Sequence, residues 1–209
     1  MPDNREIIIE ATQRLLQSHG LARLTTRDIA RGAGVAEGLI YHHFKDKAEL
    51  IFEVVLERVR NTKDVLQNLP LQVGTNTIKE NLEEVLHTIY RGHYEIVPII
   101  CSMFADRRLH IRMLEIMKER NLGSQKAIEG LTVYLAAEQR LGRLSGNINP
   151  QAAANCLWLI SIQSAMNDNL MENAVNDTDV RRQISDYVQT LMAGMAPSDK
   201  TGKIKKAKK

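Results

Sequence analysis

The sequence predicts an all-α protein. Apolar residues return every three or four positions through most of the chain, the spacing that gathers them on one face of a helix. Glycines and prolines separate these amphipathic stretches, often beside Thr, Asn or Asp residues that suit the start of a helix. No segment alternates polar and apolar residues as a half-buried strand does, and no internal repeat is visible. These observations together indicate a bundle of helices.

Length and composition are those of a globular protein. The 209 residues can form one large or two small domains, and they are 44% hydrophobic and 25% charged. No apolar run approaches the roughly 20 residues that span a bilayer. The N-terminal MPDNREIIIE lacks the basic start and apolar centre of a signal peptide. We therefore expect a cytoplasmic protein that makes no contact with a membrane.

Residue patterns that carry catalysis or metal binding are not found. The sequence has no Gly-rich phosphate loop, HExxH motif, nucleophile elbow or distinctive carboxylate pair, so we expect neither an enzyme nor a cofactor. Cys101 and Cys156 are far apart and have no CxxC pattern, which favours two reduced thiols in the core. No metal site is expected, because the histidines do not share a ligand-like spacing with the cysteines: His87, His93 and His110.

The first predicted helix covers residues 4–19 and is closed by Gly20. Its apolar side consists of two rows at helical spacing: Ile7, Ala11 and Leu15, then Ile8, Thr12 and Leu16.

The stretch TTRDIARGAGVAEGLIYHHFKDK, from Thr25 to Lys47, predicts two short helices joined by a tight turn. Thr25 or Thr26 can cap the first helix through its hydroxyl. Gly34 ends that helix, because glycine adopts the left-handed conformation at little cost. Asp46 is placed to cap a third helix. This arrangement is a helix-turn-helix.

Three constraints of spacing separate this motif from an ordinary helical hairpin. Ala30 is small where the two helices press together, Gly34 follows in the turn, and Ile40 then points back inward. A purely structural hairpin, such as a helical adaptor protein with no DNA-binding role would contain, needs the turn but not all three. We therefore interpret the motif as DNA-binding, with Ile40 and Phe44 in its core.

Residues 5–51 resemble the DNA-binding domain of the TetR family of bacterial transcriptional repressors. The resemblance is carried by the first helix ending at Gly20, the segments TTRDIARGAGV, IYHHF and KDK, and Leu50. It implies a homodimeric, all-α repressor that binds a palindromic double-stranded DNA operator and responds to a small effector molecule. The implied helix-turn-helix domain covers residues 1–47, and a helical ligand-binding and dimerisation domain covers residues 48–196.

By matching position, the resemblance assigns eight residues to the DNA interface. Thr26 and Lys47 would contact backbone phosphates, and Arg27 would reach a phosphate or a base. The recognition helix would place five more against the major groove or its edges: Glu37, Gly38, Leu39, Tyr41 and His42.

Glu37, Leu39 and the neighbouring Ala36 qualify the assignment. Glu37 suits the exocyclic amine of cytosine, but it could equally serve only to complement the positive end of its helix. Ala36 stands where the family often has a capping Ser or Thr, and Leu39 replaces a common Thr or Ser. Tyr41 and His42 would touch backbone or a thymine methyl.

The first half of the body predicts three helical segments. Residues 47–69 read as a single long helix that Pro70 ends. Thr77 and Glu80 form a capping box for the next helix. Pro98 then forces a helix start or a kink.

The second half continues the pattern. Residues 111–144 are helical, with a candidate interruption at residues 121–123. Asn149 and Pro150 start a helix that runs to about Leu170. The last helix is expected to be capped at residues 177–178.

The last two helices are candidates for the dimer interface. Small residues on the first allow close approach, and an apolar stripe on the second needs a partner. With the same helices of a second subunit they would form a four-helix bundle; the alternative is that both faces pack inside one subunit. The residues concerned are Ala153, Leu157, Ile160, Ser161, Ser164, Ala165, Val180, Ile184, Val188 and Leu191.

The resemblance also implies an effector pocket in the body, for a small and largely apolar molecule. Aromatic residues and adaptable methionines with a few polar groups are the usual lining of such a pocket. The alternative is a filled core, because apolar residues at helical spacing are usually core. The candidates are Tyr90, His93, Met103, Phe104, Met117, Tyr134, Trp158 and Gln163.

The C-terminal residues 197–209, PSDKTGKIKKAKK, are predicted to be a disordered basic tail. Six lysines and one aspartate give this segment a charge of +5, so the rest of the chain carries about −2 of the overall +3. Almost nothing in the tail can be buried to offset the entropy of ordering. The basic pI therefore comes from the tail, and the DNA-binding interpretation depends on the motif instead.

Overall fold

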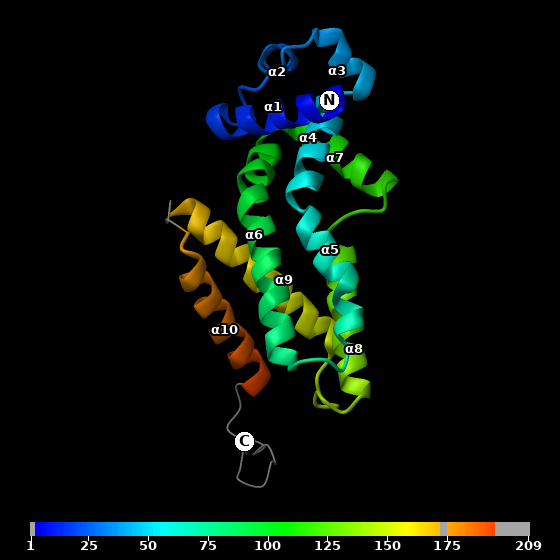
Figure 1. The fold of residues 1–209 in the computed structure, drawn as a ribbon, viewed down its shortest axis with the longest axis vertical. Coiled ribbons are helices and arrows are strands. Elements are labelled where there is room, and N and C mark those ends of the chain that lie inside the picture. Colours follow the sequence, from blue (N-terminus) through cyan, green and yellow to red (C-terminus); the bar gives the residue numbers. More distant parts are fainter. Residues whose placement is uncertain (1–2, 172–174, 195–209) are drawn as a thin grey trace.

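The computed structural model describes residues 3–171 and 175–194. Within these ranges the chain forms ten α-helices and one 3₁₀ helix, without a strand, which confirms the all-α prediction (Figure 1). None of the helices in the described ranges is both long and apolar enough to cross a membrane. The predicted tail at residues 197–209 lies outside them.

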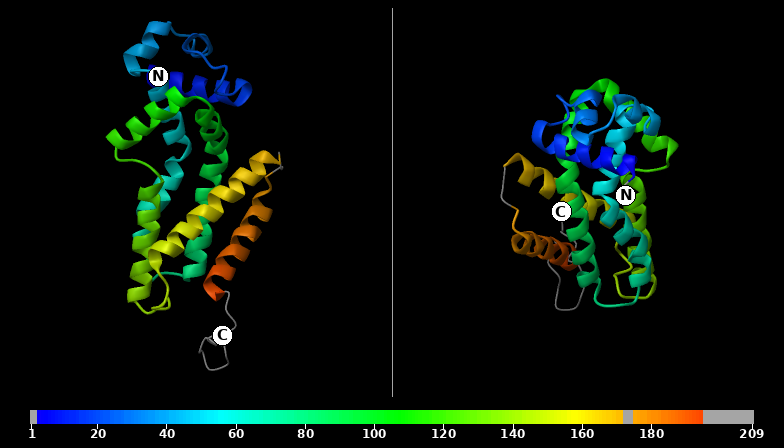
Figure 2. Two further views of the ribbon diagram at one scale, coloured as in Figure 1. Left: turned by 180° about the vertical axis from the view of Figure 1, so that it is seen from behind. Right: turned by 45° about the horizontal axis from the view of Figure 1, so that its top comes forward.

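The first three helices form a head at one end of the molecule. Helix α1 (Asn4–His19) crosses beneath α2 (Thr26–Ala33) and α3 (Glu37–His43), which lie at the outer end (Figures 1 and 2). The bounds of α1 match the prediction, and Gly20 closes it with a φ of 71°.

The predicted single helix over residues 47–69 is wrong, because it is broken at Val59. Helix α4 (Lys47–Arg58) is followed by α5 (Arg60–Asn68), and the 3₁₀ helix η1 (Leu69–Gln72) runs through Pro70. No local breaker explains the change of direction, so the cause is tertiary. Helix α5 packs closely on α6, where a side chain at Gly92 would place its Cβ 2.5 Å from Thr62 Oγ1.

Helix α6 (Ile78–Ala105) begins with the predicted capping box of Thr77 and Glu80. Pro98 lies inside this helix and does not start a new one. Proline has no N–H to donate to the carbonyl of Tyr94, four residues earlier. The side-chain amide of Asn169 donates to that carbonyl instead, at 3.0 Å, so the helix continues without an unsatisfied acceptor.

Helices α7 (Arg107–Glu119) and α8 (Ser124–Arg140) are separated at residues 121–123, as predicted, and α8 ends before residue 144. Helix α9 (Pro150–Leu170) is capped by Asn149, also as predicted. The cap of α10 (Asp177–Ala193) is Asn176 rather than residues 177–178. The Asp177 carboxylate pairs with His87 and Arg181 instead.

Two hydrophobic clusters hold the helices together. The first joins the core of the head and α4 to the end of α6 and to α7, through Ile99, Met103, Met113 and Ile116. The second joins α5, α6, α8, α9 and α10. The first cluster crosses the predicted boundary at residues 47–48, so the head packs as one unit with α7.

Both cysteines are exposed, so the prediction of two core thiols is wrong. Cys101 lies one turn after the exposed Pro98 on the outer side of α6, and Cys156 lies on the outer side of α9. Their apolar character suggested burial, but the helix faces that carry them point away from both clusters.

Candidate nucleic-acid interface

The helix-turn-helix has the predicted geometry. Thr25, rather than Thr26, caps α2 in a capping box with Asp28. Gly34 ends the helix in the left-handed conformation, with a φ of 68°. Ala30 and Ile40 are buried between the two helices, which fixes the angle at which α3 leaves the turn.

The outer side of α3 is open. Gly38 and His42 are exposed, and a Cβ added at Gly38 would meet no atom within 4 Å. The Tyr41 side chain is 54% exposed, and Leu39 is half-buried. A flat surface of this kind allows the helix backbone to approach a major groove closely.

Helix α3 starts without a side-chain cap at Ala36, as the sequence indicated. Glu37 in its first turn complements the positive end of the helix. Its carboxylate also accepts a hydrogen bond of 2.7 Å from Thr26 Oγ1 and lies 3.9 Å from Arg27 Nε. The Tyr41 hydroxyl is 3.3 Å from the same Thr26 oxygen. Four of the eight predicted DNA-binding residues therefore contact one another.

Lys47 has a structural contact within the head. Its Nζ donates to the carbonyl of Leu24, and burial lowers the pKa of this half-buried amine. Beside it, Asp46 caps α4 and binds Arg112 of α7, with 2.9 Å between Arg112 Nε and the carboxylate. Sequence analysis missed Arg112, because its partner is 66 residues away.

The predicted effector-binding residues do not line one cavity. Met103 and Met117 pack in the first hydrophobic cluster, and Tyr90, Tyr134 and Trp158 in the second. Phe104 and Gln163 are exposed.

Buried polar groups in the second cluster are paired with one another. His93 Nδ1 lies 3.0 Å from Ser161 Oγ, and its ring meets Trp158 edge to face at 4.5 Å. The Tyr90 hydroxyl donates to Asp168 at 2.6 Å. Burial lowers the pKa of His93 to about 4, so this imidazole is neutral at pH 7.

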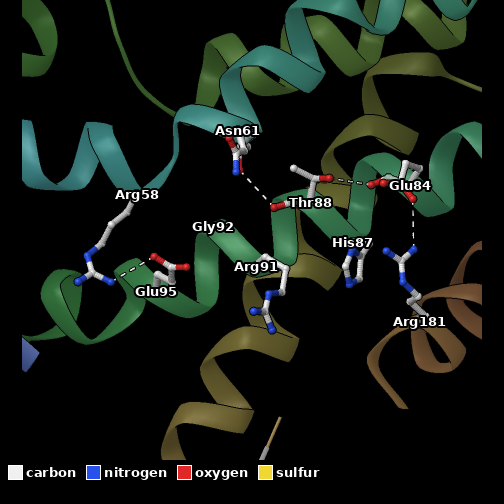
Figure 3. Close-up of a pocket in the computed structure, with 10 residues that line it drawn as sticks. Arg58, Asn61, Glu84, His87, Thr88, Arg91, Gly92, Glu95 and Arg181 are labelled. Atoms are coloured by element: carbon white, nitrogen blue, oxygen red, sulfur yellow. Dashed lines mark hydrogen bonds and ion pairs between the residues drawn. The ribbon is translucent and has the colours of Figure 1, made fainter. Parts of the chain in front are cut away.

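A polar cleft of about 370 Å³ lies on the opposite side of α6, between α5 and α10 (Figure 3). Two ion pairs cross its ends: Arg58 to Glu95 at 3.1 Å, and Arg181 to Glu84 at 3.2 Å. None of the predicted effector residues lines it. The only sign of this cleft in the sequence is that charged and polar residues recur along one face of α6: Glu84, Thr88, Arg91 and Glu95.

No group of three or more His, Cys, Asp or Glu residues in the described ranges could hold a metal ion.

Known proteins resemble this chain in sequence and in fold. Residues 8–54 match the model of the bacterial regulatory proteins of the tetR family. The HTH-type transcriptional regulator TtgR of Pseudomonas putida is 33% identical over 165 residues, with 75% of each chain covered. The family model and TtgR both describe regulatory proteins and not enzymes.

Solved structures share the fold. A Mesorhizobium loti protein assigned to the TetR family has a TM-score of 0.71 at 20% identity, covering 91% of this chain and 95% of that one. The regulator FadR from Bacillus subtilis, solved in complex with stearoyl-CoA, has a TM-score of 0.68 at 17% identity, covering 91% and 98%.

The neutral state of His93 predicts a pH dependence of stability. Its pKa is about 4 in the folded chain, against about 6.5 when unfolded. Between these values the unfolded chain binds a proton that the folded chain does not, so the free energy of unfolding falls as the pH is lowered. Urea unfolding should show that His93 accounts for about 2 kcal/mol of the loss between pH 7.5 and pH 5. His93→Gln should remove that part of the loss.

His110→Gln is the control, because it removes a half-buried histidine of α7 and should leave the His93 contribution in place. Equal pH dependence in the wild type and in His93→Gln would contradict the assignment.

Proposed function

The chain belongs to the TetR family of bacterial regulatory proteins, and we propose that it is a repressor that binds a palindromic operator as a homodimer and responds to a small, largely apolar molecule. The observation that carries this proposal is the outward-facing helix-turn-helix at the end of the molecule. A helical adaptor with no DNA-binding role, the alternative from the sequence, would leave that surface without a purpose. The protein would act in the cytoplasm, where its operator lies.

The head would read DNA with α3 in the major groove. Gly38 lets the backbone approach base edges, and Leu39 and His42 extend along the groove. Arg27 and Tyr41, both exposed, would contact backbone phosphates on either side. Lys47 already donates to the carbonyl of Leu24 and would use another of its three N–H donors for a phosphate.

Homodimerisation would use the outer side of α9. Six exposed positions on this helix alternate in steps of four and three residues, the spacing of a seam between packed helices. They are Ala152, Cys156, Leu159, Gln163, Met166 and Leu170. Leu191 and Met192 of α10 are also exposed, at 41% and 42%. An apolar seam of this size in a single subunit favours a partner that covers it.

The residues first expected to face the partner are mostly buried within one subunit. Leu157, Ser161, Ser164 and Ala165 point inward, and Val180, Ile184 and Val188 of α10 pack in the second cluster. The small residues of α9 do allow helices to pack closely, but the helices that pack on them belong to the same subunit. The proposed dimer therefore depends on the opposite side of α9.

An effector would act through α6. This helix contributes Ile99 and Met103 to the cluster of the head, and Tyr90 and Val97 to that of the body. A ligand that opened the body core beside His93 and Trp158 would displace α6, and the displacement would reach the head. The FadR structure holds stearoyl-CoA, whose acyl chain is apolar, and this supports an effector with an apolar part.

A duplex from the region upstream of the chain's own gene tests DNA binding. Half-site centres should lie about one helical turn, roughly 34–36 Å, or a multiple of it apart. Lys47→Ala should weaken binding to operator and random DNA alike and reduce the salt slope by about one unit.

Lys126→Ala, on α8, is the control and should change neither quantity. Wild-type affinity that is equal for the operator and for random DNA at every salt concentration would exclude operator recognition.

Leu159→Glu tests the dimer seam. The side chain is 61% exposed, so the subunit should fold normally. Burying a carboxylate in an apolar seam should weaken dimerisation by about a hundredfold or more, with a parallel loss of operator affinity, measured by sedimentation and by fluorescence anisotropy.

The control is Leu71→Glu, which places the same charge at a 75% exposed position of η1 and should sediment as the wild type does. The α9 seam is ruled out if Leu159→Glu remains dimeric at micromolar concentration.

A screen of aliphatic and aromatic metabolites for a raised melting temperature tests the effector. A ligand present at a hundred times its Kd should stabilise the chain by about 2.7 kcal/mol. It should also change operator affinity, because a switch requires different affinities for the two states. Ligands that stabilise the protein but leave operator affinity unchanged would contradict the switch.

A further inference from the structure

One carboxylate in the head holds two residues that DNA would otherwise bind. We propose that Glu37 is a specificity-determining residue: it withholds Thr26 from the DNA phosphates until a base amine takes the place of the threonine hydroxyl. The inference rests on the proposed recognition of an operator by α3.

The contact uses the only proton that the Thr26 side chain can donate. A threonine hydroxyl carries one proton, and an ionised carboxylate can only accept. Because Thr26 Oγ1 donates to Glu37 Oε1 at 2.7 Å, the same hydroxyl cannot donate to a phosphate oxygen. The other carboxylate oxygen lies 3.9 Å from Arg27 Nε and also attracts that cation.

The position of Glu37 makes it able to exchange partners. It is in the first turn of α3, the part of a recognition helix that meets base edges, and its side chain is 39% exposed. The next residue, Gly38, has no side chain to obstruct it. If Glu37 served only to complement the helix end, its charge alone would suffice, and the bond across the turn to α2 would not be needed.

The exchange separates matching from non-matching DNA. On a matching base pair the amine of cytosine, or that of adenine, can donate to the carboxylate in the major groove. Thr26 is then free to donate to a phosphate, and Arg27 is less strongly held. On other sequences the amine lies on the opposite strand, out of reach of Glu37, so Thr26 stays bound and a negative charge remains near the phosphates. One base is thus read twice, through a hydrogen bond from the base to Glu37 and another from Thr26 to the backbone.

Two substitutions measured on two duplexes test the exchange. Glu37→Ala should raise affinity for a random duplex by roughly tenfold and steepen its salt slope by up to about one unit, because it frees Thr26 and Arg27 and removes a charge that repels phosphate. It should lower the preference for the operator. Thr26→Val should lower operator affinity and leave random-duplex affinity unchanged.

The control for charge is Glu10→Ala, which removes an exposed carboxylate from α1 and should raise random-duplex affinity much less. Thermal melts show whether each variant is folded. If Glu37→Ala does not fold, Thr26→Val still decides, since its effect should differ between the two duplexes.

Equal losses on both duplexes for Thr26→Val would overturn the proposal, since the hydroxyl would then contact phosphate on every sequence. An unchanged or lower random-duplex affinity for Glu37→Ala would do the same. Failure of operator recognition is a separate result: the wild type would then show no sequence preference, while the response of the random duplex to Glu37→Ala would still report the release of Thr26.

Discussion

The head keeps its position relative to the body because α6 belongs to both hydrophobic clusters. Its C-terminal part packs with the head through Ile99 and Met103, and its middle packs with the body through Ile89 and Tyr90. Such a helix must remain continuous to transmit position. Pro98 removes one backbone hydrogen bond from the interior of this helix. The side-chain amide of Asn169, on α9, donates to the carbonyl of Tyr94 in its place. Helix α6 thereby connects the head, the body core and α9, which carries the proposed dimer seam.

Local chemistry made most of the secondary structure predictable. Caps at Thr77 and Asn149 and the left-handed turn at Gly34 act within a few residues of their own position, so the sequence alone reveals them. The break at Val59 could not be predicted, because no local residue causes it. It follows from the close packing of α5 against Gly92, a residue of the next long helix. The prediction that Asp177 caps α10 is wrong for a similar reason, because its carboxylate contacts His87 of α6 instead.

The candidate site was likewise predictable only where its features depend on local sequence. The open side of α3 follows from helical spacing, and in the structure Gly38, Tyr41 and His42 are exposed. The pairing of Thr26 with Glu37 depends on the crossing of two helices, and no pattern in the sequence specifies it. In the body, residue type alone could not distinguish pocket lining from core. Tyr90 and His93 are buried and paired with Asp168 and Ser161, whereas Phe104 and Gln163 face outward.

Charge placement explains how the head can face DNA although residues 1–50 carry seven basic and seven acidic side chains. Several of the acidic side chains in and below the head are bound on the side that meets α1 and α7. Arg112 binds Asp46, Arg120 binds Glu49, and Glu53 accepts from both Arg5 and Arg120. Burial opposes the ionisation of Glu53, but the hydrogen bonds from the two arginines outweigh it and lower its pKa.

These carboxylates are thus neutralised by arginines of α1 and at or after α7, on the side of the head that meets the body. On the exposed side, Arg23 and Lys45 form no ion pair with any described residue, and Arg27 has only the distant carboxylate of Glu37. Counting charges along the sequence therefore underestimates the positive character of the outer surface. Glu37 adds a negative charge to the recognition helix itself. A carboxylate in such a position works against phosphate binding in general, so it is useful only if a particular base can compensate for it.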